Sequence, residues 1–164
     1  METPQFNTQQ LMVSTLKQIG CQPNVNEDDT VAVTYQGEHF HIDFGGLYAQ
    51  LWDLGWAKVN VADPNLPNIR EAVNIANGNF GPTVVMSPAD EKGDIYLHSR
   101  LGILLHPSLP DIEDYLRSNL DMFFRAKDAV RQNLQQLNFD QQKDRETRRP
   151  VGFNSIADSP ENSN

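Results

Sequence analysis

The 164 residues carry 13 Lys and Arg against 22 Asp and Glu, for a formal net charge of −9. This length is typical of a single domain with a sizeable hydrophobic core. The negative charge argues against partners such as nucleic acids and anionic membranes, because both are bound through clustered Lys and Arg. The lone cysteine, Cys21, excludes an intramolecular disulfide framework and a multi-cysteine zinc site, and we expect a buried, inert thiol.

The first half of the chain is expected to form one helix and three antiparallel strands. Apolar residues at helical spacing predict a helix over residues 7–19, which ends at Gly20. Alternating apolar residues predict a hairpin formed by residues 31–35 and 39–44. Aromatic and β-branched residues then favour a third strand over residues 47–61, with a bulge near Gly55.

The second half is expected to form one hairpin between two helices. Pro64 and Pro67 precede apolar residues at helical spacing over residues 69–76, which predict a short helix. Residues 83–87 and 94–105 are expected to form a second hairpin. Ser108 and Asp111 resemble a capping box, and the apolar pattern after them predicts a long helix over residues 108–138.

The last part of the chain differs in composition from the rest. Residues 139–164 contain few apolar side chains, too few to offset the entropy of ordering them. We therefore expect one α+β domain over residues 1–138 and a polar, mobile tail over residues 139–164. The first residues show no secretory signal and no segment is apolar enough to span a membrane, so we expect a cytoplasmic protein.

Four side chains of the predicted hairpins could hold a metal ion. His39 and His41 are two residues apart on one strand and therefore share a face, Asp43 follows at the same spacing, and His98 lies on the other hairpin. A metal-dependent binder or enzyme is the alternative that these residues keep open. The simpler interpretation is that both strand histidines face solvent opposite the apolar face. The sequence contains no nucleophile motif or phosphate-binding loop, and we expect neither a catalytic residue nor a cofactor.

Large apolar side chains are the better candidates for a binding surface. Tyr48, Trp52 and Trp56 recur at four-residue spacing on an extended segment, which would place all three on one face, either in the core or against a partner.

The long predicted helix raises the same question, because it is longer than the predicted strands. Its apolar stripe continues through Val130, Leu134 and Leu137, beyond the expected end of the sheet. A second copy of the chain could cover this stripe, which predicts a homodimer. The alternatives are that the helix bends or that Val151, Phe153 and Ile156 of the tail fold back over it.

The order of elements, α-β-β-β-α-β-β-α, resembles the type III secretion chaperone-like fold, including the YbjN-like family of proposed bacterial sensory transduction regulators. The residues that carry the resemblance are Phe-His-Ile-Asp-Phe at 40–44, Arg-Glu-Ala-Val-Asn-Ile-Ala-Asn at 70–77 and Ile-Glu-Asp-Tyr-Leu-Arg-Ser-Asn-Leu at 112–120. The resemblance covers residues 8–137 and transfers no site residue. It implies an antiparallel sheet with helices packed on it, and a non-enzymatic protein that binds a polypeptide client, as a chaperone or a regulatory adaptor, commonly as a homodimer.

Overall fold

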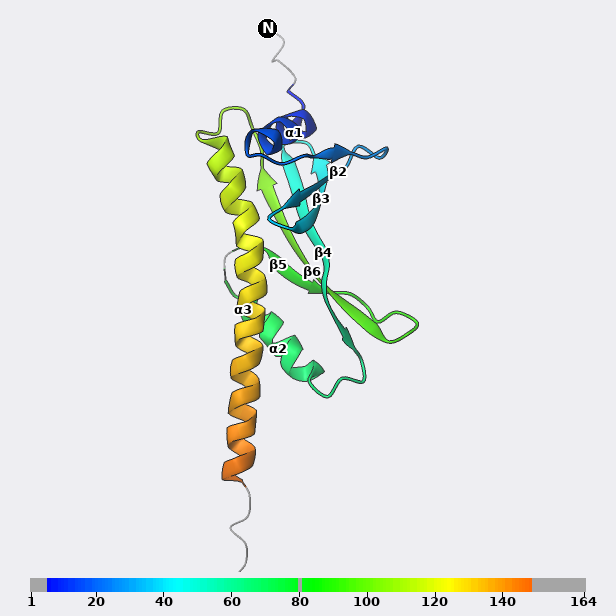
Figure 1. The fold of residues 1–164 in the computed structure, drawn as a ribbon, viewed down its shortest axis with the longest axis vertical. Coiled ribbons are helices and arrows are strands. Elements are labelled where there is room, and N and C mark those ends of the chain that lie inside the picture. The colour runs from blue at the N-terminus through cyan, green and yellow to red at the C-terminus, as the bar shows by residue number, and fades with distance from the viewer. Residues whose placement is uncertain (1–5, 80, 149–164) are drawn as a thin grey trace, which may run out of the picture.

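The computed structural model describes residues 6–79 and 81–148. The elements that it contains, in chain order, are α1 (Thr8–Gln18), β1 (Asn24–Val25), β2 (Val31–Tyr35), β3 (Glu38–Gly45), β4 (Tyr48–Asn60), α2 (Leu66–Ala76), β5 (Thr83–Met86), β6 (Asp94–Leu104) and α3 (Ile112–Thr147). The strands form one antiparallel sheet in the order β1-β2-β3-β4-β6-β5 (Figure 1). The α+β class and the order of the main elements predicted from the sequence are therefore confirmed.

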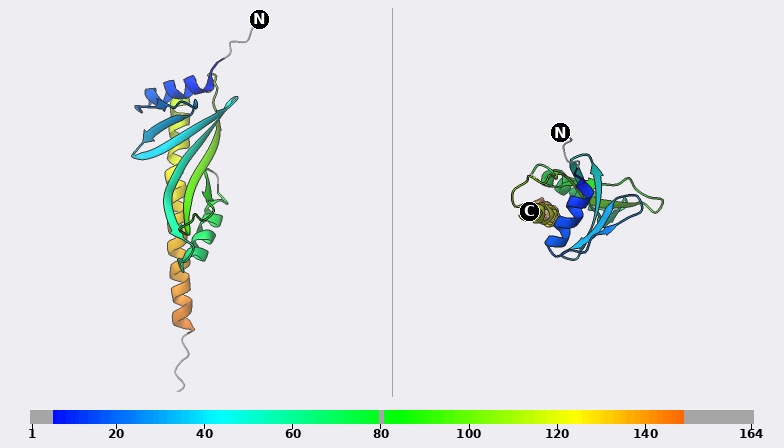
Figure 2. Two further views of the ribbon diagram at one scale, coloured as in Figure 1. Left: turned by 90° about the vertical axis from the view of Figure 1, so that its right-hand side faces the viewer. Right: turned by 90° about the horizontal axis from the view of Figure 1, so that it is seen from above.

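The helices lie on one side of the sheet. α3 runs along the length of the molecule, α1 crosses one end of the sheet, and α2 packs against the second half of α3 (Figures 1 and 2). No helix of residues 6–79 and 81–148 covers the opposite side, which faces the viewer in the left panel of Figure 2. We call the two sides of the sheet the inner face, against the helices, and the outer face.

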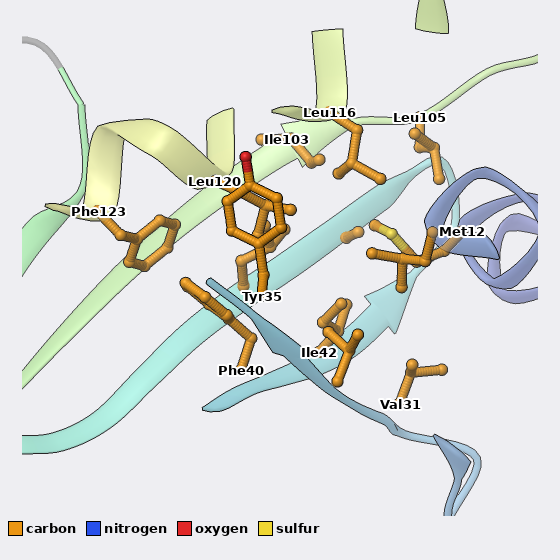
Figure 3. Packing of buried hydrophobic residues seen from close by; sticks show 14 residues of the cluster. Met12, Val31, Tyr35, Phe40, Ile42, Ile103, Leu105, Leu116, Leu120 and Phe123 are labelled. Carbon is orange, nitrogen blue, oxygen red and sulfur yellow. The ribbon is translucent and has the colours of Figure 1, made fainter. Parts of the chain in front are cut away.

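A first hydrophobic cluster fills the space between α1, the sheet and the first half of α3 (Figure 3). Met12, Ile42 and Leu116 are completely buried in it. The rings of Phe40 and Phe123 meet edge to face with centroids 5.0 Å apart, which is a favoured geometry for aromatic pairs. Alternation along β2 and β3 supplies the inner-face side chains, as the sequence predicts.

A second hydrophobic cluster lies farther along α3. It joins α2 and α3 to the second half of the β4–β6 pair, and its buried members include Val59, Ala72, Ile95 and Val130. The two clusters hold α3 as far as Leu137 against the rest of the fold, and its exposed last turns extend beyond the sheet (Figure 1). Within the part of the chain that the structure describes, no helix is long and apolar enough to cross a membrane.

Both ends of α3 differ from the prediction. Asp111 is the N-cap residue in a left-handed conformation (φ 49°) and its side chain caps no N–H, while the Ser108 hydroxyl contacts His106 Nδ1 at 2.6 Å instead. The predicted capping box is therefore wrong. The helix also continues nine residues past Asn138 to Thr147, because exposed polar residues with helix propensity extend it. The remainder of the predicted tail, including Val151, Phe153 and Ile156, lies outside the described residues.

Candidate functional site

A β-bulge in the middle of β4 decides which side chains reach the outer face. The pairing of β4 with β6 shifts register between Asp53 and Ala57, and Gly55 adopts φ 65° within this interval. The Gly55 N–H donates a hydrogen bond to His98 Nδ1 at 2.8 Å. Glycine tolerates this left-handed conformation at no steric cost. The predicted bulge near Gly55 is thus present.

The bulge separates Trp56 from the other two aromatic residues of β4. Trp56 packs against the second cluster, and its Nε1 donates a hydrogen bond at 3.0 Å to the hydroxyl of the completely buried Ser99. The prediction that Tyr48, Trp52 and Trp56 share one face is therefore wrong for Trp56, because the extra residues of the bulge change the alternation of the strand.

Tyr48 and Trp52 remain on the outer face. Tyr48 is 62% exposed. Trp52 is half-buried, and the Arg100 guanidinium carbon lies 5.9 Å from the centre of its ring, a distance typical of a cation–π contact. His41 lies opposite Trp52 on the neighbouring strand. The outer face thus combines aromatic and polar side chains, with the exposed Leu104 opposite Tyr48 on β6.

The histidines of β3 project from the outer face, as alternation predicts. His39 Nδ1 lies 2.8 Å from the Thr34 hydroxyl, and His41 Nε2 lies 3.1 Å from an Asp43 carboxylate oxygen. His98 Nδ1 accepts the hydrogen bond from Gly55 in the bulge. Among the residues that the structure describes, no three His, Cys, Asp or Glu side chains gather closely enough to hold a metal ion. The structure therefore does not bring His39, His41, Asp43 and His98 together as one ligand set.

The apolar stripe of α3 is covered from within the chain. Val130 is 4% exposed, and the partly buried Leu134 and Leu137 pack against the same cluster as α2. An Asn133 side-chain N–H also donates to the Ala72 carbonyl of α2 at 3.3 Å. The premise that this stripe has no cover within the monomer is therefore wrong. Its cover is α2, and the stripe no longer supports the predicted homodimer.

The structure also contains a buried polar group that the sequence analysis did not single out. Lys127 Nζ lies 2.7 Å from Asp53 Oδ2 and 3.1 Å from Glu38 Oε2, and the Lys127 and Asp53 side chains are each 3% exposed. The close contact with Asp53 meets the distance of an ion pair but not the geometry of a hydrogen bond. Lys127 also lies 5.3 Å from the centre of the Phe124 ring.

Burial dominates the electrostatics of this group. Removal from water raises the pKa of Asp53, although the Lys127 ammonium opposes this shift by attracting the ionised carboxylate. Lysines are rarely this buried unless they are paired. The one signal in the sequence is the position of Lys127 within the apolar stripe of α3. Because the group is enclosed between the two clusters, we interpret it as structural: it fixes α3 against β4.

Comparisons with known proteins find the same fold at low sequence identity. No family model matches the chain, and no curated protein matches it in sequence. One similar solved structure is an uncharacterized protein from Methanothermobacter thermautotrophicus, with a TM-score of 0.52 and 17% identity, over 79% of this chain and 98% of that one. Another is YbjN from E. coli, a proposed transcription regulator, with a TM-score of 0.49 and 10% identity, over 80% and 92% of the two chains. The predicted likeness to YbjN is thus found among solved structures, and at such identities it concerns the fold alone.

Proposed function

We propose that this protein is a non-enzymatic binding module, a chaperone-like protein or regulatory adaptor, whose outer sheet face receives a segment of a partner polypeptide. The observation that carries the proposal is the uncovered sheet itself. Among the described residues, α1, α2 and α3 all lie on the inner face, while the outer face presents Tyr48, Trp52 and Leu104 to solvent. Aromatic side chains are enriched among residues that dominate binding to partner proteins.

The strand pairing supports an extended segment as the form of the partner. β3 pairs with β4 only from Tyr48 to Asp53, whereas β6 accompanies β4 as far as Asn60. Beyond the bulge, the edge of β4 that faces β3 has no strand partner among the described residues. This open edge begins just after Trp52 and runs away from Tyr48, and an extended peptide can add to such an edge of a sheet. Lys58 on this edge and the bulge limit unspecific pairing.

Site-specific photo-crosslinking tests the proposal with two closely matched positions. Tyr48 on the outer face and Phe139 on α3 are both aromatic, and both are 62% exposed. Replacing each in turn with p-benzoylphenylalanine gives two probes of similar chemistry on different surfaces. In a lysate of the native cells, position 48 is expected to form discrete adducts that map to a recurring polypeptide segment, while position 139 forms few. Equal adducts at both positions, or adducts at position 139 alone, would contradict the proposal.

A further inference from the structure

Two glycines of the sheet have no conformational or packing reason to be glycine. Of the nine glycines that the structure describes, six adopt positive φ, and a Cβ at Gly78 would lie 3.3 Å from a backbone oxygen. Gly45 and Gly102 differ: both lie in strands without positive φ, and an added Cβ would meet nothing within 4 Å at Gly45 and only Gln50 Oε1, at 3.5 Å, at Gly102. Glycine weakens a strand, so a glycine that the fold does not need often marks the close approach of a ligand or another chain.

Gly45 and Gly102 flank the same part of β4. Gly45 lies opposite Tyr48 on β3, and Gly102 lies opposite Gln50 on β6. Their neighbours Phe44 and Ile103 pack into the first cluster, so both glycines face outward by alternation. The two missing side chains leave a hollow of about 370 Å³ on the outer face, lined also by Tyr48, Gln50 and Asp43.

The chemistry of this hollow favours a cation. The exposed Tyr48 offers an aromatic ring, and the Asp43 side chain is 48% exposed, with one carboxylate oxygen shared with His41. An aromatic ring beside a carboxylate suits a guanidinium or an ammonium group, which can contact the ring and the acid together. The nearby cation, Arg100, lies over the Trp52 ring, next to the hollow. The net charge of −9 attracts a basic partner to the whole molecule.

We propose that the hollow between Gly45, Tyr48 and Gly102 binds an arginine or lysine side chain of the partner polypeptide. This inference rests on the proposed function and specifies the partner: a basic segment that lies across the outer face and inserts one cationic side chain beside Tyr48 and Asp43. The glycines provide the depth for this side chain, and the acid provides the charge preference.

Binding to a library of nonapeptides with blocked ends, measured at physiological salt, tests the proposal. The wild type is expected to select peptides with Arg or Lys at one fixed position. Gly102→Val fills the hollow without changing the charge, and the strand accommodates valine because an added Cβ would make only an ordinary van der Waals contact, at 3.5 Å from Gln50 Oε1. We expect this variant to bind the selected peptides at least about tenfold more weakly.

Two charge-matched variants separate the hollow from general attraction to an acidic protein. Asp43→Asn removes a negative charge in the hollow, and Glu91→Gln removes one from an exposed turn. We expect Asp43→Asn to weaken binding of the selected peptides about three- to tenfold, and Glu91→Gln to weaken it less than about twofold. Thermal unfolding of each variant verifies that it is folded.

The outcomes distinguish this inference from the function on which it rests. The proposal that a basic side chain occupies the hollow is overturned if the selected peptides show no preference for Arg or Lys. It is also overturned if Gly102→Val binds them as tightly as the wild type does. The proposed function survives that result if Trp52→Ala still weakens binding of the selected peptides. Absence of binding to any peptide contradicts both.

Discussion

The buried ion pair between α3 and β4 provides a sharp test of how the fold is held together. The two side chains are each 3% exposed, so solvent does not screen their interaction. Lys127→Met leaves the Asp53 carboxylate buried without its cation, and Glu38 adds a second negative charge at the same site. Loss of one partner of a buried pair costs about 3 to 5 kcal/mol of unfolding free energy. Asp53→Asn should cost less, about 1 to 3 kcal/mol, because Glu38 remains 3.1 Å from Lys127.

Replacing both partners should remove most of this cost. An Asp53→Val/Lys127→Met double variant removes both buried charges and leaves only Glu38, which is 38% exposed and remains in contact with solvent. Such replacements of a buried pair are often neutral or stabilising. The two substitutions should therefore be strongly non-additive in a double-mutant cycle. Urea unfolding at neutral pH, followed by tryptophan fluorescence, measures the free energies.

The pH dependence of Lys127→Met adds an independent check. Burial raises the pKa of Asp53 above 3.8, and loss of the lysine removes the main opposing effect. The protonated carboxyl is then favoured in the folded state, so stability is gained as pH falls through the raised pKa towards 3.8. The deficit of Lys127→Met relative to wild type should therefore shrink as pH falls from 7 towards 3.8. A cost below about 1 kcal/mol for Lys127→Met, or additive effects in the double variant, would refute this description of the pair.

Three further predictions follow from other contacts. The pKa of Tyr35 is raised to about 12, first by burial and then by its 2.7 Å hydrogen bond to Asp121, so the folded state favours the neutral hydroxyl. As pH rises from 10 to 12, wild type should therefore lose about 2 kcal/mol more unfolding free energy than Tyr35→Phe. Parallel stability curves of the two proteins in alkaline unfolding would contradict this. Gly55→Ala should lower the unfolding free energy by about 1 to 2 kcal/mol, since Gly55 adopts φ 65°; an unchanged midpoint in urea would show that the bulge relaxes. Leu134→Asp should destabilise the chain by about 1 to 3 kcal/mol, because Leu134 packs beside α2; a folded variant with half the wild-type mass in light scattering would instead restore the homodimer prediction.

Local patterns allowed much of the fold to be predicted from the sequence. Alternation placed His39 and His41 on the outer face, and a glycine inside a strand pattern located the bulge at Gly55. The consequence of the bulge for Trp56 was missed, because spacing arguments assume an uninterrupted strand. The burial of Val130 by α2 was missed for a different reason: contacts between helices distant in the sequence leave no local pattern.

The candidate site depended still more on tertiary structure. The outward orientation of Tyr48 and Trp52 is consistent with the predicted spacing, but an aromatic residue on one face of a strand fits a core and a binding surface equally well. These alternatives are distinguished by the placement of α1, α2 and α3, the helices of the described residues, on the inner face. Similarly, the sequence alone does not distinguish Gly45 and Gly102 from ordinary glycines of a turn and a strand. Only the strand register shows that they lie on either side of β4.

Amide chemical shifts of the wild-type protein with its tightest-binding nonapeptide test the outer face most directly as the binding surface. The account predicts that the largest changes fall on Tyr48, Gln50, Trp52 and Gly102, whereas α2 and the second half of α3 change little. The largest changes confined to α2 and α3, with the outer-face amides unaffected, would contradict it.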